Sequence, residues 1–402
     1  MFHRPTRAMR RDLSQLLCAV AGLVLGVLLP RLSVGTQVAT GPVATMLFTI
    51  GFGVISLVSI IYSVLFLVVQ FSASTFTPRL SLFRDEPIVW RAFAFAIGVF
   101  VFCISAGLSI GTDKQVSVVL PCAATLLTLI ALALMRTLQT KAFVSIQLAH
   151  SLTAITVRAH RVFDVLYERP YEPGRQAAAA PPPPTGTGAR LVRWTGPAAV
   201  LQQIDVDALV AAAHRHDCSI ALHVAPGRTV SREMPLAGVT GGDLPERVLR
   251  EALITGVERT FDQDPGLPFR LLVDIALRAL SSAVNDPATA VESMDRLEDL
   301  LVRLADRELD IGRITDRAGE VRLTVPVPDW ESYVRTVVDD LALAAAGSPM
   351  ALRRMRDLLG RLLEQSPEDR RAVVRERLAW VEHTGRERYP IAWTARTSPT
   401  GG

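Results

Sequence analysis

The longest stretch without charge constrains this chain more than any other feature of its sequence. Residues 32–78 contain no Asp, Glu, Lys or Arg over 47 consecutive positions, and residues 92–112 and 115–135 are uncharged stretches of 21 residues each. A helix needs about 20 apolar residues to cross the hydrocarbon core of a bilayer. The sequence therefore predicts four membrane-spanning helices, at about residues 13–33, 43–69, 90–111 and 115–135.

The composition favours the same class of protein. Half of the 402 residues are hydrophobic and 20% are charged, which is less charge than a soluble enzyme of this size usually carries. The first span can also be interpreted as a cleaved signal peptide, because arginines precede it. No small-residue cleavage site follows it, however, and three more spans do. We therefore expect a multi-pass protein that keeps its first span.

Basic residues beside the spans predict the orientation of the chain. Arginine and lysine concentrate on the cytoplasmic side of membrane proteins. Here they flank the N-terminus, the loop after the second span and the segment after the fourth, whereas the two other loops offer only Arg31 and Lys114. We expect a plasma (inner) membrane protein with both termini in the cytoplasm.

The chain after the spans changes character twice. Residues 170–190 have the sequence PYEPGRQAAAAPPPPTGTGAR, which is too rich in Pro, Ala and Gly to bury a core. Periodicity and turn residues predict a mostly helical α+β domain beyond this linker. We expect five segments: a four-helix transmembrane domain (1–140), an amphipathic helix leaving the membrane (141–169), the linker (170–190), a cytoplasmic α+β domain (191–390) and a disordered tail (391–402).

Local patterns place the elements of the α+β domain. The segment 224–239, VAPGRTVSREMPLAGV, has the rhythm of a β-hairpin. The other expected elements are strands near 190–194, 198–204 and 218–224, helices near 205–214, 245–258, 268–283 and 287–307, a hairpin near 310–327, and helices near 330–346, 348–365 and 368–384.

The amphipathic helix after the fourth span carries an apolar stripe at heptad spacing. Spacings of 4, 3, 4, 3 and 4 residues are those of a helix-packing seam. The stripe can pack on a helix of the same chain or join copies in a homo-oligomer, and both interpretations remain open. Its members are Leu148, Leu152, Ile155, Ala159, Val162 and Leu166.

Two stretches resemble a known bacterial family. They are FSASTFTPRLSLFRDE (71–86) and ERTFDQDPGLPFRLLVDIALRALSSAVNDPATA (258–290). Together with the order of spans, linker and soluble domain, they are similar to predicted membrane proteins that contain a domain of unknown function, DUF2254. The chain departs from that pattern locally, at Phe76-Thr77-Pro78-Arg79 and at Ser282-Ala283. The resemblance implies an architecture and a membrane location, but no activity.

The second span carries hydroxyl groups along one face. Small and hydroxyl residues in a membrane helix serve close helix packing, and they can also line a water-filled pore. Both interpretations remain open for Thr45, Thr49, Ser56, Ser59, Ser63 and Gln70. Gly22 and Gly26 on the first span have the GxxxG spacing of close helix packing. The spans lack intramembrane charge, which argues against proton-coupled transport.

The stretch RLLVDIALRALSSAVNDPATAVESM (270–294) has the most unusual placement of charge in the soluble part. Eight of residues 271–280 are apolar, so this helix should be buried nearly all round. Asp274 and Arg278 lie one turn apart within it and can pair. Asp286 before Pro287 predicts an N-cap with proline at the first helical position, and Asn285 tolerates the turn between the helices.

Two interpretations of this helix corner remain open. It can be an ion-paired structural corner, whose buried charges need further hydrogen bonds. It can instead bind a small anionic ligand through an arginine and the free amides at the start of the 287 helix. No nucleophile or base stands beside its carboxylates, so we predict no catalytic residue. The candidate ligand-binding residues are Arg259, Asp262, Asp264, Asp274, Arg278, Asn285 and Asp286.

The lysines and the metal-ligating residues exclude several functions. Lys114 and Lys141 are the only lysines, and neither lies in the soluble domain, which excludes a lipoyl carrier, a biotin carrier and a Schiff-base enzyme there. The histidines and cysteine of HRHDCSIALH (214–223) lack a paired metal-ligand spacing. We expect no metal, no cofactor, no nucleic-acid partner and no enzymatic activity.

Two functions remain compatible with the sequence. The first is an oligomeric pore or channel-like protein with a cytoplasmic ligand-sensing domain, favoured by the hydroxyl face and the heptad stripe. The second is a membrane-anchored sensor or scaffold without a pore. The partners expected for either are the lipid bilayer, further copies of the chain and a small ligand.

Overall fold

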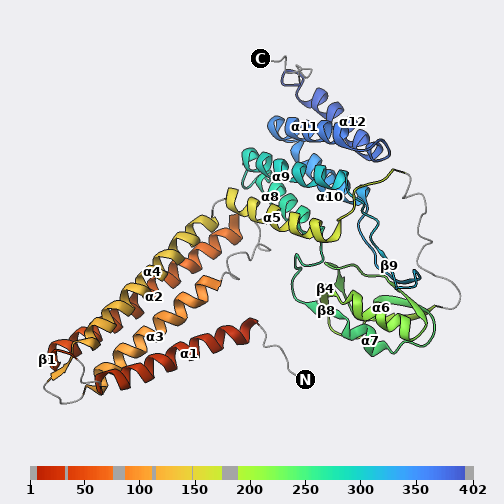
Figure 1. The fold of residues 1–402 in the computed structure, drawn as a ribbon. Coiled ribbons are helices and arrows are strands. Elements are labelled where there is room, and N and C mark those ends of the chain that lie inside the picture. The colour runs from red at the N-terminus through yellow and green to blue at the C-terminus, as the bar shows by residue number, and fades with distance from the viewer. Residues whose placement is uncertain are drawn as a thin grey trace. The chain divides into compact units, whose positions relative to one another are not determined.

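The computed structural model describes residues 7–31, 35–75, 87–110, 115–146, 148–173 and 189–393. Two compact units divide the chain, Met1–Ser151 and Leu152–Gly402. The predicted loop after the second span, most of the predicted linker and residues 394–402 of the predicted tail lie outside the described residues. Figure 1 shows the helices and strands of both units.

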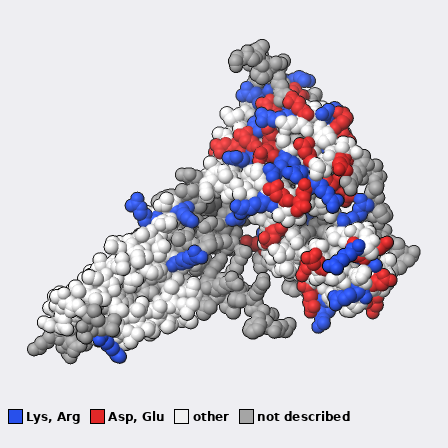
Figure 2. Space-filling model, viewed as in Figure 1, with Lys and Arg blue, Asp and Glu red and all other residues white. Residues whose placement is uncertain are grey.

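The first unit consists of four long apolar helices. Within them lie four segments long and apolar enough to cross a membrane: Ser14–Arg31, Thr40–Leu67, Val89–Ser109 and Val119–Lys141. The four predicted spans are thereby confirmed. Figure 2 shows the surface of these helices as almost entirely uncharged, whereas charged side chains crowd the second unit. The helices are α1 (Arg7–Leu28), α2 (Thr40–Thr75), α3 (Pro87–Ser109) and α4 (Val119–Ile146).

Helix α2 is longer than a bilayer core requires. Its 36 residues extend over about 54 Å at 1.5 Å per residue, compared with about 30 Å of hydrocarbon. Next to the N-terminal ends of α2 and α4, the short strands β1 (Gln37–Ala39) and β2 (Gln115–Ser117) pair antiparallel. This pairing joins the connection before α2 to the connection before α4.

Close packing of small residues joins α1 to α3. A Cβ added at Gly22 would clash with the backbone of Gly98, and one added at Gly26 would clash with Ser105. The GxxxG spacing of the first span therefore serves packing within the chain. The interior of the unit is filled by fully buried side chains, among them Leu47, Phe102, Leu120 and Leu138.

Most of the next helix lies in the second unit, where it packs with the other helices of that unit. Helix α5 (Leu148–Leu166) buries Leu152, Ile155, Ala159 and Val162 of the predicted stripe. Its Phe163 stacks on Phe269 with ring centroids 5.9 Å apart. The heptad stripe therefore packs inside its own chain.

Five further helices complete this layer. Three predicted helices are confirmed to within a few residues. The predicted 268–283 helix ends earlier, at Ala279, and the predicted 368–384 helix begins with a 3₁₀ turn before its α-helical part starts at Arg371. The elements are α8 (Leu267–Ala279), α9 (Pro287–Ala305), α10 (Trp330–Ala345), α11 (Pro349–Gln365), the 3₁₀ turn η3 (Glu368–Arg370) and α12 (Arg371–Arg388).

Two small sheets form the rest of the second unit. The five-stranded sheet has the order β3-β7-β5-β10-β9, with β10 parallel to β5, and the three-stranded sheet has the order β6-β4-β8. The strands are β3 (Arg190–Arg193), β4 (Ala199–Ile204), β5 (Cys218–Leu222), β6 (Thr229–Val230), β7 (Pro235–Gly241), β8 (Leu253–Gly256), β9 (Arg313–Thr315) and β10 (Val321–Thr324), and the helices beside them are α6 (Val206–Arg215) and α7 (Glu246–Glu251).

Two predictions for this region are wrong. The segment 224–239 does not form a hairpin, because β6 pairs with β4 in the smaller sheet and β7 lies between β3 and β5 in the larger one. The predicted 245–258 helix ends at Glu251, and β8 follows it. In both places long-range strand pairing overrides the local pattern. The predicted 205–214 helix and the β9–β10 hairpin are confirmed.

Candidate functional site

The helix corner predicted from the sequence is built from its own polar groups. Asp286 caps α9: one carboxylate oxygen accepts from the amide of Thr289 at 3.2 Å and the other from its hydroxyl at 2.6 Å. These bonds lower the pKa of Asp286 below its usual value. Asn285 takes a left-handed conformation with φ +50°, and Pro287 is the first residue of α9. The amides expected to be free are thus engaged by a carboxylate of the chain.

At the other end of α8, Asp264 forms a second closed cluster. Its side chain is buried and accepts from Arg259 Nε at 2.7 Å, Arg259 Nη2 at 2.9 Å and the amide of Leu267 at 3.1 Å. Gly227 packs against it with φ +86°, and a Cβ at that position would clash with the Asp264 carboxylate. Arg259 and Asp264 therefore lock the loop before α8 to the loop after β5.

The predicted ligand-binding residues are split between these two clusters. The 13 residues of α8 separate them by about 20 Å at 1.5 Å per residue. Between them, Asp274 Oδ1 lies 3.8 Å from Arg270 Nε, and the half-buried Arg278 accepts from the Ser281 hydroxyl at its carbonyl. Asp262 is exposed. Binding of an anion by these residues stays a prediction.

The hydroxyl face of α2 lies on the outside of the first unit. Its six predicted members are all exposed, and the hydroxyls of Thr45, Thr49, Ser56, Ser59 and Ser63 donate to the carbonyl four residues earlier at 2.7–3.1 Å. Such bonds satisfy hydroxyls inside apolar surroundings. A pore lined by this face would need more than one copy of the chain.

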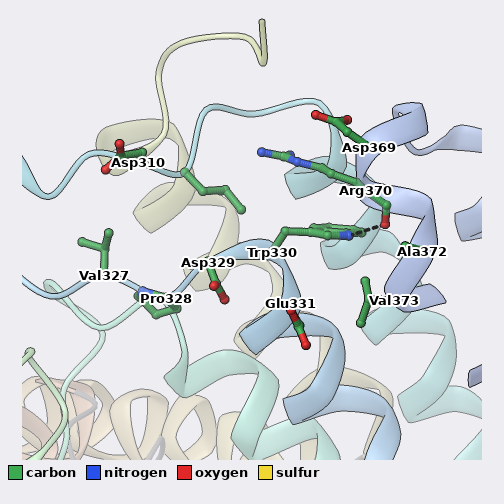
Figure 3. Close-up of a pocket in the computed structure, with 11 residues that line it drawn as sticks. Asp310, Val327, Pro328, Asp329, Trp330, Glu331, Asp369, Arg370, Ala372 and Val373 are labelled. Carbon is green, nitrogen blue, oxygen red and sulfur yellow. Dashed lines mark hydrogen bonds between the residues drawn. The ribbon is translucent and has the colours of Figure 1, made fainter. Parts of the chain in front are cut away.

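A cavity in the second unit was not predicted from the sequence. It has a volume of about 540 Å³ and lies where the N-terminus of α10 meets η3 and the start of α12 (Figure 3). The loop after α9 and the segment after β10 close its other sides. Its lining residues are Leu309, Asp310, Val327, Pro328, Asp329, Trp330, Glu331, Asp369, Arg370, Ala372 and Val373.

Arg370 is the most deeply buried charge of this cavity, with 3% of its surface exposed. Its Nη1 donates to the carbonyl oxygens of Leu304, Ala305 and Arg307 at 3.1, 2.8 and 3.0 Å. A cation at the C-terminus of α9 is favoured by the helix dipole. Burial nevertheless lowers the pKa of Arg370. Its Nε and Nη2 have no hydrogen-bond partner among the described residues.

Two aromatic rings hold the Arg370 guanidinium. The Tyr171 ring centroid lies 3.8 Å from its Cζ, and the Trp330 ring centroid lies at 5.6 Å. Trp330 Nε1 donates to the Arg370 carbonyl at 2.9 Å, as Figure 3 shows. The Tyr171 hydroxyl donates to Asp369; burial, together with this bond, raises the pKa of Tyr171 to about 12. The hydroxyl therefore stays protonated at neutral pH.

Four exposed carboxylates surround the mouth of the cavity. Asp310 pairs with Arg313 at 2.9 Å, Glu331 pairs with Arg335, and Asp329 caps α10 by accepting from the Ser332 amide at 2.8 Å. Asp369 is the partner of Tyr171. Against these four carboxylates stand Arg370 in the lining and the two paired arginines beside it, so the cavity and its rim keep an excess of one negative charge. Asp310, Asp369 and their neighbours come from segments some 60 residues apart, so no local pattern announces the site.

The side chains of the histidine-rich segment 214–223 make contacts within and beside the five-stranded sheet. His214 Nδ1 lies 3.1 Å from Asp316, whose carboxylate also accepts from Arg322 Nε at 2.9 Å. The bond from Arg322 holds the pKa of Asp316 well below its usual range. Cys218 is buried in β5, and this burial raises the pKa of its thiol. Within the described residues, no group of three or more His, Cys, Asp or Glu side chains is arranged to hold a metal.

Comparisons with known proteins identify relatives over most of the chain. Residues 13–361 match the family described as predicted membrane protein, DUF2254. The chain is 30% identical over 356 residues to the uncharacterized proteins Rv1290c of Mycobacterium tuberculosis and Mb1321c of Mycobacterium bovis. This match covers 84% of the chain and 66% of each relative, so the chain spans less than two thirds of the length of these relatives. No solved structure matches it. The chain belongs to the DUF2254 family of predicted membrane proteins.

Proposed function

We propose that this protein is a membrane-anchored sensor whose second unit binds a small organic cation. The cavity at Trp330 is the observation that carries this proposal. Its volume of about 540 Å³ lies within the range of about 300–1,000 Å³ typical of small-molecule sites. The first unit supplies the anchor, since its interior is filled by packed side chains.

The charge of the cavity selects the ligand class. Carboxylates from four positions face solvent around it, and they attract ammonium or guanidinium groups. An aromatic side chain beside a cation adds a further attraction, and Trp330 lines the same cavity. Nothing in this lining forms a nucleophile and base pair, so the proposed role is binding and not catalysis.

The proposed location of the second unit is the cytoplasm, below the plasma (inner) membrane. The distribution of arginine and lysine beside the spans supports it. Cysteine labelling in intact cells tests this orientation: a cysteine introduced at exposed Asp340 should resist a membrane-impermeant maleimide until the cells are opened. Labelling in intact cells would place the unit on the opposite side.

Calorimetry on the full chain in detergent tests the binding function. We expect titration with putrescine or L-ornithine to give a saturable signal, and Glu331→Gln to weaken it by about fivefold, the usual size of one partly screened charge interaction. Asp340→Asn removes an exposed acid on the same helix, outside the cavity lining, and should change nothing. If neither compound binds, or if Glu331→Gln has no more effect than Asp340→Asn, the cavity is not the proposed receptor site.

A second candidate function is an oligomeric pore. The exposed hydroxyl face of α2 favours it, because this face is available to meet its counterparts in other copies. Dye release from proteoliposomes separates the two candidates. A sensor without a pore leaves the vesicles tight with or without putrescine. Leakage in wild type that Ser59→Leu abolishes would favour the pore.

A further inference from the structure

We infer that the ligand of this cavity is a basic amino acid, with its carboxylate on Arg370 and its side-chain cation among the acidic residues at the mouth. The inference rests on the proposed function and names the ligand class of the same site. Two opposite chemical features of the cavity lining carry it, and each excludes a simpler ligand.

The first feature is the incomplete hydrogen bonding of Arg370. Guanidinium groups that are almost fully buried normally use their donors, and a buried donor without a partner calls for an explanation. Here Nη1 serves the end of α9, whereas Nε and Nη2 lack a partner among the described residues. These two nitrogens are the edge of the guanidinium that binds a carboxylate through two parallel hydrogen bonds.

The position of Arg370 relates these donors to the cavity. In Figure 3 its side chain extends over the Trp330 ring, toward the middle of the residues drawn. The aromatic rings of Tyr171 and Trp330 hold it there. Arg370 is therefore held in one rotamer beside the cavity, with Nε and Nη2 covered by neighbouring side chains.

The second feature is the excess of carboxylates at the mouth. Asp310, Asp329, Glu331 and Asp369 repel a ligand that carries only negative charge. A ligand that carries only positive charge satisfies these groups but leaves the donors of Arg370 unmet. A molecule with a carboxylate at one end and a cation at the other satisfies both.

Tyr171 connects the two features. Its ring covers Arg370, and its hydroxyl donates to Asp369, which lines the cavity. Both Nε and Nη2 are shielded from solvent, so the ligand must displace a neighbouring side chain to reach them. A cation that binds Asp369 competes with the Tyr171 hydroxyl and thereby releases the ring from its position over Arg370.

Two probes that differ by one carboxylate test the inference. L-ornithine and putrescine share a carbon chain with two amines, and only ornithine has the carboxylate. Putrescine carries the larger positive charge, so the acidic mouth alone favours putrescine. On the full chain in detergent, calorimetry should nevertheless show ornithine binding at least about tenfold more tightly, as a charged hydrogen-bonded pair implies. Equal affinity, or tighter binding of putrescine, overturns the inference and leaves the proposed function in place. Binding of neither overturns the proposed function itself.

Changing either Arg370 or the carboxylate of the ligand completes the test. Arg370→Lys keeps a cation near the α9 carbonyls but removes the paired donors, so the advantage of ornithine over putrescine should disappear. If this variant does not fold, L-ornithinamide with wild-type protein makes the equivalent change in the ligand and should bind no better than putrescine. Ornithinamide that binds as tightly as ornithine shows that the carboxylate makes no contact with Arg370.

Discussion

The Asp264 cluster before α8 and the Trp330 cavity each contain an almost fully buried charged side chain, but its hydrogen bonding differs between them. Asp264 accepts three hydrogen bonds, and every one comes from the chain itself. In the cavity, Arg370 leaves two donors without a partner among the described residues. The segment that is conspicuous in the sequence satisfies its buried charge from within the chain, whereas the inconspicuous one leaves buried donors unused.

The largest expected effect tests whether the Asp264 cluster stabilises the fold. Asp264→Asn leaves the Arg259 guanidinium without its anion and should lower the free energy of unfolding by about 3 kcal/mol, the usual loss when one partner of a buried pair is removed. Thermal unfolding of the full chain in detergent measures it. Asp340→Asn, an exposed acid on α10, should stay within about 0.5 kcal/mol. Equal effects of the two variants would show that the Asp264 cluster does not stabilise the fold.

A comparison of two glycines separates the cost of backbone strain from the cost of crowding at the Asp264 carboxylate. Gly227 and Gly319 have nearly the same φ, +86° and +87°, but an added Cβ meets the Asp264 carboxylate at Gly227 and nothing within 4 Å at Gly319. We expect Gly227→Ala to cost about 2–3 kcal/mol of stability and Gly319→Ala about 1 kcal/mol. The same unfolding measurement compares them. If the two costs are the same, the carboxylate does not pack against the loop as tightly as the structure shows.

The cap at the other end of α8 predicts a pH dependence. Asp286→Ala should cost about 1 kcal/mol at neutral pH through the lost N-cap. The hydrogen bonds from Thr289 lower the pKa of Asp286 in the folded state. Its stabilisation is therefore fully present above the unfolded pKa of about 3.9 and is lost as the pH falls through the folded pKa.

The measurement for this cap is the difference in unfolding temperature between wild type and Asp286→Ala, followed from neutral pH to below pH 4. The difference should shrink only at the acidic end. Asp262→Ala removes an exposed acid from the connection before α8 and should show no such trend. A difference that stays constant to low pH would mean that the carboxylate does not act as a charged cap.

Some parts of this structure could be predicted from the sequence and others could not, for physical reasons. Uncharged stretches longer than 20 residues have few alternatives to membrane helices, so the spans were predictable. Asp286 before Pro287 is a local signal, and the cap forms as expected. The corner residues Asn285 and Asp286 were visible because they lie next to each other in the chain.

Features that depend on distant segments were not predictable. The pairing of β6 with β4, and not with β7, is decided by partners outside the local pattern. The cavity unites Asp310 with Arg370 across some 60 residues, and nothing near either residue marks it as part of a site. A pattern restricted to one segment shows which helix forms, but not which donors remain unused when helices meet.

The smallest expected effect tests the hydrogen bond between Tyr171 and Asp369. Tyr171→Phe keeps a ring over Arg370 but removes the hydroxyl that donates to Asp369. Because a ligand cation then meets Asp369 without a competitor, L-ornithine should bind about threefold more tightly, the effect of one modest hydrogen bond. Calorimetry on the full chain measures the change.

A second tyrosine provides the matched control for that measurement. Tyr167 lies four residues before Tyr171, just after the end of α5, and its hydroxyl lies 2.7 Å from that of Tyr333 in the buried core. Neither of these two lines the cavity, so Tyr167→Phe should alter stability and leave the affinity for ornithine unchanged. Weaker binding of ornithine by Tyr171→Phe would mean that the hydroxyl helps to hold the ligand. The hydroxyl would then not compete with the ligand for Asp369.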